Sequence, residues 1–425
     1  MPRKRPRRRV ASQRDQVQRA SEANGIWAYD FVFDTCANGH PCFVATLFTL
    51  PDRFIAYPSQ TESVALCNEI DLLIVDEAGQ VPPEIGAPSF ALAKQALVVG
   101  DVDQIEPIWA IPGHIDSANV LHSELVDGED ALQVFRESGM AASSGSLMRM
   151  AQRATPYAKY PERGRGLFLS EHRRCWPEII RMCNVLVYGG RLQPCREDKG
   201  ERKIVPSVGY VHIPGNDRSR GGSRDNPAEA TAIAQWLALR KEEIEAAYSN
   251  ERIGRLVAVV TPFAAQSQRV KSALDDTLGA GHGITVGTVH ALQGAERRVV
   301  IFSPTYGLET DPGRTFIDRN RSMLNVAISR AQDAFLVFGN THLFQPVGQY
   351  PCAVIGRMLF GDGGNEISGV DPVLCSVGAR AGHGARTPDC QPRRSSLRLE
   401  GCAGDGAAAC GDRVAVPDRD GYRCR

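Results

Sequence analysis

Lysine is scarce in this chain, and paired cysteines and long apolar runs are missing from it. Only seven of the 49 basic residues are lysine, and the twelve cysteines are spread without any C-x-x-C spacing. This spacing argues against a zinc site and a disulfide framework. No apolar run approaches the roughly 20 residues that span a bilayer, and no apolar segment follows the basic start MPRKRPRRRV to make a secretory signal. We therefore expect a reduced, intracellular protein with no membrane partner, cytoplasmic or, in a eukaryote, nuclear.

Length and charge set further limits. A chain of 425 residues is long enough for two packed domains. Its formal net charge is +0, so no overall field draws it to nucleic acid or to anionic lipid. Any basic binding surface must therefore be local.

Composition divides the chain into four parts. Residues 1–20 are basic and polar without periodicity, which is typical of a disordered lead-in. Apolar runs alternate with helix-like stretches over 40–165 and again over 166–350, with a less regular insertion from Ile111 to a boundary near Arg165. Residues 361–425 are rich in Gly, Ala, Arg and Cys, and we expect a disordered, low-complexity tail.

The apolar runs predict parallel strands. LLIVDE (Leu72–Glu77) and ALVVGD (Ala96–Asp101) suit strands buried on both faces of a sheet, and the residues between them suit a crossover helix. Asn226 and Pro227 begin the clearest predicted helix. Later strands are predicted at Arg255–Thr261, Ile284–Val289, Arg298–Ser303 and Ala334–Asn340. The predicted fold class is α/β with parallel sheets.

Two carboxylates end the first of these strands. Asp76 and Glu77 follow LLIV directly, and ligands bind at the carboxyl ends of strands in open α/β sheets. One carboxylate can hold Mg²⁺ while its neighbour polarises an attacking water. The alternative is an ordinary strand end with two solvated acids.

Three further stretches could take part in phosphate chemistry. Gln104, in GDVDQIEP, could sense a terminal phosphate, although a strand followed by a turn explains the same pattern. Gly294 lies in a loop that could contact a nucleotide or a phosphate backbone, or could simply connect two strands. Arg330 and Arg173 could neutralise charge on a transferred phosphoryl group, or could be surface arginines.

The motifs are more specific together than singly. In order along the chain they are DEAGQ, GDVDQIEP, LSEHRRCWPEI, VVTPFAAQ, TVHALQGAE and LNVAISRA. This series, from about Phe43 to Asn340, resembles the superfamily 1 helicases, in particular the 1B branch that includes the nonsense-mediated-decay and Okazaki-flap helicases. The resemblance implies two RecA-like domains, of which this chain would hold an incomplete first and a full second. ATP would lie between them, and a single strand of DNA or RNA would cross the top.

The same resemblance assigns roles to residues of the nucleotide site. Asp76 is similar to the Mg²⁺ ligand and Glu77 to the catalytic base. Gln104 is similar to the γ-phosphate sensor. Arg173 and Arg330 resemble the two arginine contacts that the second domain supplies.

Four more residues are assigned through the fifth and fourth motifs. Gly294 and Glu296 match residues on the nucleotide side, and Thr261 and Thr288 match contacts to the nucleic-acid backbone. His172 departs from the family's usual tyrosine.

One element of the family pattern is missing from these 425 residues. A phosphate loop of this class reads G-x-x-x-x-G-K-[ST], yet none of the seven lysines follows a glycine. We therefore expect a truncated helicase with weak or no autonomous ATP hydrolysis. The alternative is a non-catalytic nucleic-acid-binding or scaffold protein that uses the second domain. A magnesium phosphohydrolase built on Asp76, Asp101 and Asp103 would leave the other motifs unexplained.

Overall fold

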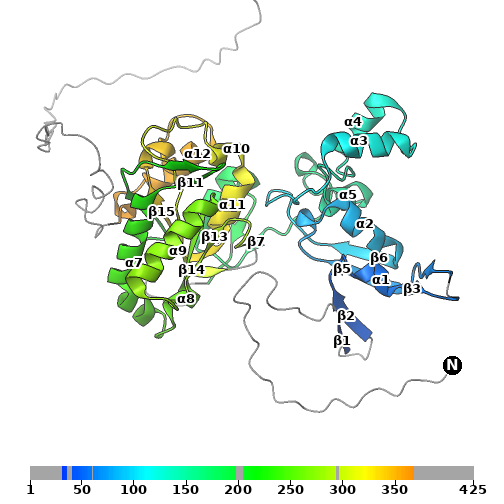
Figure 1. The fold of residues 1–425 in the computed structure, drawn as a ribbon, viewed down its shortest axis with the longest axis horizontal. Helices are drawn as coiled ribbons and strands as arrows, with labels where there is room; N and C mark the ends of the chain where they lie inside the picture. The colour runs from blue at the N-terminus through cyan, green and yellow to red at the C-terminus, as the bar shows by residue number, and fades with distance from the viewer. Residues whose placement is uncertain (1–30, 36–40, 60, 198–203, 293–295, 368–425) are drawn as a thin grey trace, which may run out of the picture. The chain divides into compact units, whose positions relative to one another are not determined.

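The computed structural model describes residues 31–35, 41–59, 61–197, 204–292 and 296–367 (Figure 1). All of them belong to one compact unit, Met1–Gly378, and a second unit, Ala379–Arg425, lies outside the described residues. The predicted lead-in and most of the predicted tail also lie outside them. The domain boundary near Arg165 stays a prediction.

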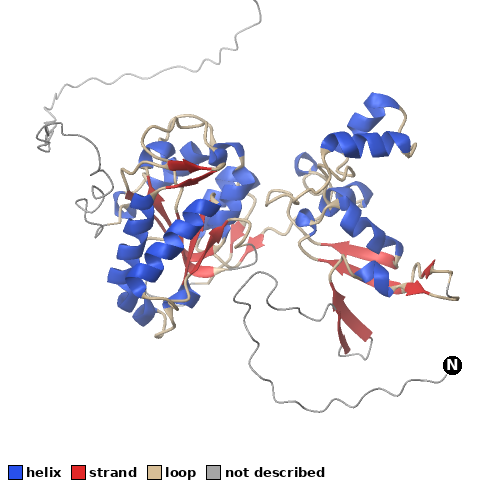
Figure 2. Cartoon of the chain, in the orientation of Figure 1, coloured by secondary structure: helices blue, strands red, loops and turns tan. Residues whose placement is uncertain are grey.

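A five-stranded parallel sheet forms the centre of residues 204–367 (Figure 2). Its strand order is β13 (Thr285–Thr288), β12 (Val257–Thr261), β14 (Arg297–Phe302), β15 (Ala331–Gly339) and β9 (Val208–His212). Every neighbouring pair runs parallel. The strands predicted after residue 250 are all present, shifted at their ends by up to three residues.

Both faces of this sheet are buried, which explains why its strands read as continuous apolar runs. Val257 and Val259 pack into one core and Ala258 and Val260 into the other, because successive side chains of a strand point to opposite faces. One core is completed by α7 (Pro227–Ala247) and α9 (Ala264–Leu278). The other is completed by α6 (Pro177–Cys183), α11 (Arg321–Ser329) and α12 (Pro351–Leu359).

The predicted long helix is confirmed as α7. The Asn226 side chain accepts hydrogen bonds from the backbone N–H groups of Ala228 and Glu229, and Pro227 occupies the first turn. This cap satisfies N–H groups that have no partner inside the helix. A short helix, α8 (Ile253–Leu256), precedes β12 where a longer strand was predicted.

The predicted β-α-β unit is also present. Strand β5 (Ile70–Val75) is followed by α2 (Pro83–Ala91) and pairs in parallel with β6 (Ala93–Val98). The expectation that both strands are buried on both faces is wrong. Leu72 is 51% exposed, Ile74 62% and Leu97 52%, because the surrounding core packs on the face that carries Leu73 and Val75.

Several shorter elements lie outside these two sheets. The strands β1 (Phe31–Thr35) and β2 (Pro41–Ala45) pair antiparallel, as do β10 (Arg218–Arg220) and β11 (Ser223–Asp225). The stretch read as an irregular insertion contains α3 (Gly113–His122), α4 (Gly128–Glu137) and α5 (Leu147–Ala154). Among the described helices, none is long and apolar enough to cross a bilayer.

The start of the predicted tail is ordered. Ile367 is only 9% exposed, packs into the core beside α7, and donates its backbone N–H to Tyr210 at 2.9 Å. The packing of Ile367 could not be predicted from the composition of residues 361–425, because a single apolar residue makes no periodic pattern.

Candidate functional site

The turn after β5 holds a strained residue. Glu77 adopts φ 54° and ψ 33°, a left-handed conformation that residues other than glycine rarely take. Its backbone N–H donates to Asp76 Oδ1 at 2.9 Å, and Gln80 Nε2 donates to its Oε2 at 2.8 Å. Such strain is concentrated at functional sites. Asp76 and Glu77 thus stand side by side at the carboxyl end of a strand, as predicted.

Two glycines bring the first two motifs into backbone contact. A Cβ on Gly100 would lie 2.8 Å from the backbone nitrogen of Gly79, and one on Gly79 would lie 2.5 Å from the carbonyl oxygen of Asp101. The Ala78 N–H donates to the Val99 carbonyl at 2.9 Å. The turn that carries Glu77 is therefore held directly against the loop that carries Gln104.

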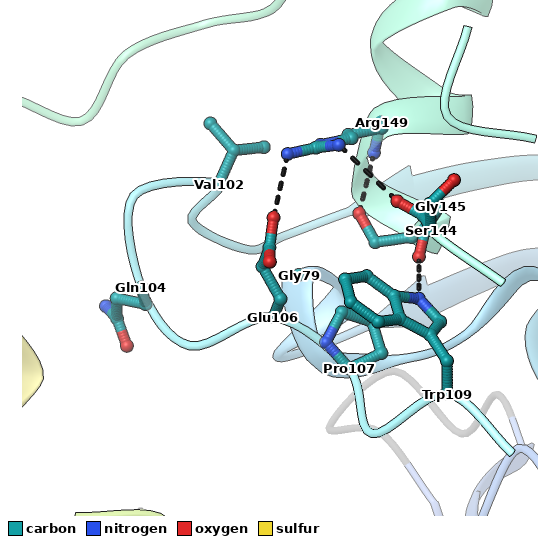
Figure 3. A pocket seen from close by; sticks show the side chains of 10 residues that line it. Gly79, Val102, Gln104, Glu106, Pro107, Trp109, Ser144, Gly145 and Arg149 are labelled. Carbon is teal, nitrogen blue, oxygen red and sulfur yellow. Dashed lines mark hydrogen bonds and ion pairs between the residues drawn. The ribbon is translucent and has the colours of Figure 1, made fainter. Parts of the chain in front are cut away.

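Gln104 lines a small pocket beside this contact (Figure 3). Its Nε2 donates to Asp101 Oδ2 at 3.3 Å, and its buried Oε1 has no partner among the described residues. The same loop is fastened by Arg149, which pairs with Glu106 at 3.1 Å. The neighbouring Trp109 donates its indole N–H to the Gly145 carbonyl at 2.8 Å. The amide of Gln104 is thus held in place with one oxygen free to accept.

Asp101 connects this loop to residues much later in the chain. The Tyr188 hydroxyl donates to Asp101 Oδ2 at 2.5 Å, and Asn325 Nδ2 donates to the Tyr188 oxygen at 3.0 Å and to the Asp103 carbonyl at 3.2 Å. Burial raises the pKa of Asp101, while the Tyr188 hydrogen bond opposes that shift. Sequence reasoning missed Tyr188, since a lone tyrosine in an apolar stretch gives no signal.

Arg330 is buried at the end of α11, with only 5% of its surface exposed. Its Nε has no partner among the described residues. Burial and the nearby Arg174 guanidinium lower its pKa, whereas Glu77 and Glu296 raise it. A buried guanidinium with an unused donor is costly unless an acceptor fills the place.

The neighbouring arginines pair with different acids. The Arg173 side chain is 66% exposed and pairs with Glu171 at 2.6 Å. Arg174 pairs instead with Glu296 at 2.8 Å, and Gln332 also donates to Glu296 at 3.1 Å. The role given to Arg173 stays a prediction, but the structure brings Arg174 to this site. Two consecutive arginines follow β7 (Glu171–His172), and sequence spacing could not choose between them.

Of the remaining predicted residues, Thr288 and Glu296 lie at the two ends of the segment that joins β13 to β14, and Thr261 lies at the end of β12. Gly294 lies outside the described residues, and Glu296 directly precedes β14. Thr288 ends β13 and accepts the Ala291 N–H at 3.4 Å. Thr261 ends β12 but is fully buried, and its hydroxyl is 3.1 Å from that of Thr305. Its predicted contact with a nucleic-acid backbone stays a prediction.

The site residues predicted within 204–367 lie at the two opposite ends of the five-stranded sheet. Glu296 and Arg330 precede β14 and β15, at the amino ends of these strands, and the Arg297 N–H donates to the Arg330 carbonyl at 3.1 Å. Thr261 and Thr288 are at the carboxyl ends. Because all five strands run parallel, one end can serve a nucleotide and the other a separate ligand.

No metal site is complete in the described part of the chain. It contains no group of three or more His, Cys, Asp or Glu side chains placed to hold a metal ion. Asp76 alone would leave a magnesium ion dependent on phosphate and water oxygens, as is usual for that ion. In this parallel α/β protein, the acids after one strand and the buried arginine before another are residue types that bind metal-phosphate groups.

Comparison with known proteins agrees with this class. A family described as "AAA domain" matches residues 144–342. The mouse (Mus musculus) protein "RNA helicase Mov10l1" is 26% identical over 41% of this chain and 16% of its own length. "DNA polymerase alpha-associated DNA helicase A" of Saccharomyces cerevisiae is 25% identical over 65% of this chain and 39% of its own length. The chain thus spans well under half the length of these relatives.

Among solved structures, the crystal structure of Arterivirus nonstructural protein 10 (helicase) is 12% identical. The match covers 68% of this chain and 41% of the helicase chain, with a TM-score of 0.29. The family match and the sequence relatives support the recognition of a superfamily 1 helicase, and the chain is similar to the C-terminal part of such a protein. Its branch within that superfamily stays a prediction.

Proposed function

We propose that this chain binds single-stranded DNA or RNA as the C-terminal portion of a helicase motor, and that by itself it hydrolyses ATP weakly or not at all. The relatives of this chain support the nucleic-acid part, since they include an RNA helicase and a DNA helicase. The nucleotide part rests on the residues around Glu77 and Arg330.

The observation that carries the proposal is the buried Arg330 with its unused Nε. Glu77 lies close enough to affect its pKa. Gln104 adds a buried amide oxygen without a partner. These groups suit the terminal phosphate of a nucleoside triphosphate and the water that would attack it, because guanidinium and amide groups bind phosphate and water without needing a proton change.

The fit to Mg-ATP is incomplete. Bound Mg²⁺ would neutralise phosphate charge, and Asp76 would hold it together with phosphate oxygens. However, no G-K-[ST] occurs in these 425 residues, so the lysine and hydroxyl that normally bind the β-phosphate and the metal are not supplied. We therefore assign no hydrolytic step to this chain alone.

The second candidate is a non-catalytic nucleic-acid-binding or scaffold protein. The same missing loop favours it. The two candidates differ in one respect, which is whether ATP changes the affinity for a strand. If Arg330 and Gln104 still bind a triphosphate, ATP should alter strand binding, whereas a pure scaffold should not respond.

ATP hydrolysis by the purified chain tests the proposal directly. We expect phosphate release with Mg-ATP to stay close to the enzyme-free background, with or without a single-stranded oligonucleotide. Hydrolysis that is well above background and is abolished by Glu77→Gln would contradict the proposed loss of autonomous activity. Glu366→Gln, an exposed carboxylate far along the chain from this site, serves as the matched control.

Strand binding is measured separately. We expect a fluorescein-labelled single strand to bind at low salt and to be released as salt rises, since phosphate contacts dominate such affinity. Lack of binding at low salt to both a DNA and an RNA strand would refute the nucleic-acid role.

A further inference from the structure

Three aromatic rings meet at the carboxyl end of the five-stranded sheet. Phe263 follows β12, and its ring centroid lies 5.5 Å from that of Tyr306 in an edge-on arrangement and 6.3 Å from that of Phe316. Phe316 is 42% exposed, whereas Tyr306 is 4% exposed. We call these three residues the aromatic platform. Its solvent-facing ring is Phe316.

Hydrogen bonds fix the backbone of the aromatic platform at Phe316. The Tyr306 hydroxyl accepts the Phe316 N–H at 2.8 Å. Thr315 caps the short helix α10 (Phe316–Arg319) by accepting the Asp318 N–H at 3.1 Å, and its hydroxyl donates to Asp318 Oδ2 at 2.6 Å. An exposed aromatic ring on a fixed backbone loses little conformational entropy when it binds a ligand.

A buried carboxyl fixes the segment that delivers Tyr306. Glu229 is fully buried, and its Oε2 accepts the Ser303 hydroxyl and, at 2.9 Å, the Thr305 N–H. Thr305 has φ 78°, an outlier for a β-branched residue. The Glu229 contacts therefore hold a strained turn directly before the platform, and strain of this kind is kept at ligand sites.

Arginines border the rings. The Arg224 guanidinium lies 5.6 Å from the Tyr306 ring centroid and pairs with Asp217, whose other oxygen accepts the Gly307 N–H at 3.0 Å. Arg218 and Arg319 are exposed on the neighbouring hairpin and helix. The exposed acids Glu309 and Asp311 lie in the same loop, and Asp311 pairs with Arg314 at 3.4 Å. Arg224 beside Tyr306, with exposed arginines on the same hairpin and on α10, suits a ligand that is both anionic and aromatic.

We propose that the aromatic platform stacks a base of a single nucleic-acid strand on Phe316, while Arg224 and its exposed neighbours contact the phosphates. This inference deepens the proposed function and rests on it. Single-strand binders combine a basic track with aromatic faces, because every base offers a π-face and every linkage a charge. The platform lies at the end of the sheet opposite Arg330, so a strand bound there leaves the nucleotide residues free.

The test compares binding of three labelled probes, measured by fluorescence anisotropy at one fixed salt concentration. The probes are a thymidine 12-mer, a uridine 12-mer, and an abasic 12-mer that has only sugar and phosphate. Phe316→Ala should weaken binding to the two strands with bases by roughly 5- to 150-fold, the range typical for loss of one stacked base. It should leave binding to the abasic strand unchanged.

Two further Phe316 variants and one surface control separate stacking from folding. Phe316→Leu keeps an apolar contact with Phe263 but has no aromatic face, so it should bind as weakly as Phe316→Ala. Phe316→Trp should retain wild-type affinity, and the strands with bases should quench its new fluorescence. Leu239→Ala removes a side chain that is 73% exposed on α7 and should bind like wild type.

The outcomes distinguish the two proposals. If the wild type binds none of the probes, the proposed function fails. If the wild type binds the strands with bases and Phe316→Ala or Phe316→Leu binds them equally well, only the stacking inference fails. Equal losses on the strands with bases and on the abasic strand would also overturn it, because the ring would then act on the backbone rather than on a base.

Discussion

Glu77 shows how a single residue can store strain at a site. Its left-handed backbone costs on the order of 1 kcal/mol or more relative to an ordinary conformation. Glycine would adopt the same angles without that cost, yet the sequence has a carboxylate there. The conformation places two acids on one tight turn, which favours the reading of this turn as a phosphate-handling site over that of an ordinary strand end.

Substitution of Glu77 tests this strain. Glu77→Gly should leave the free energy of unfolding unchanged or raise it by up to about 1 kcal/mol, because the strain is relieved. Glu77→Val should lower it by about 1 to 2 kcal/mol, since a β-branched residue fits the left-handed region poorly. Urea denaturation measures both. At Glu366, which is exposed and has φ −75°, the Val variant should be more stable to unfolding than the Gly variant, the reverse of the order at Glu77. The same order at both positions would show that Glu77 is not strained.

At the scale of elements, the turn after β5 and the loop after β6 fit together only because two glycines meet. No Cβ can be added at Gly100 without displacing the backbone of Ala78 or Gly79, at distances of 3.0 and 2.8 Å. Close backbone approach is a packing role that only glycine can fill. The contact fixes how far Glu77 lies from the Gln104 loop.

Gly100→Ala should therefore destabilise the protein by about 1 to 3 kcal/mol, the usual range for overpacking. The denaturation midpoint in urea measures the loss. Gly363→Ala is the matched control, because a Cβ there meets nothing within 4 Å, and its free energy of unfolding should stay within about 0.5 kcal/mol of wild type. A wild-type midpoint for Gly100→Ala would mean that the two loops separate easily.

The elements that sequence predicted well are those with strong, repeated physical signals. Strands β12, β14 and β15 are buried on both faces, so nearly every residue is apolar, and α7 has a cap and helical spacing. The one-sided burial of β5 and β6 was not predicted, because the exposed side chains Leu72, Ile74 and Leu97 are apolar like the buried ones. The direction in which individual side chains point could not be predicted from the sequence either. Arg174 rather than Arg173 reaches Glu296, and Thr261 turns inward, through contacts with residues distant in sequence.

For the whole molecule, two titratable groups, the half-buried His172 and the fully buried Glu229, make stability depend on pH in opposite directions. Burial lowers the pKa of His172 to about 4 from 6.5. The neutral ring is favoured in the folded state, so this contribution is complete above pH 6.5 and is lost as pH falls toward 4. Burial raises the pKa of Glu229 to about 8 from 4.5, and hydrogen bonds from Ser303 and Thr305 oppose that shift. The nearby Asp217 adds to it.

The Glu229 contribution has a definite sign. The unfolded carboxyl loses its proton near pH 4.5 while the folded one keeps it to about 8, so the contribution is complete below 4.5 and is lost as pH rises through 8. Between these values the wild type should lose up to about 1.4 kcal/mol of unfolding free energy per pH unit from this group. Glu229→Gln, which cannot ionise, should show no such loss.

The measurement is urea denaturation of wild type and Glu229→Gln at a series of pH values from 5 to 8.5. Their difference isolates Glu229, because His172 and the other groups titrate in both. Glu242→Gln, exposed on the same helix, should follow the wild-type curve. A constant difference between wild type and Glu229→Gln across this range would mean that the carboxyl is ionised inside the fold. Thr305 and the aromatic platform would then be held by a buried anion rather than by a neutral acid.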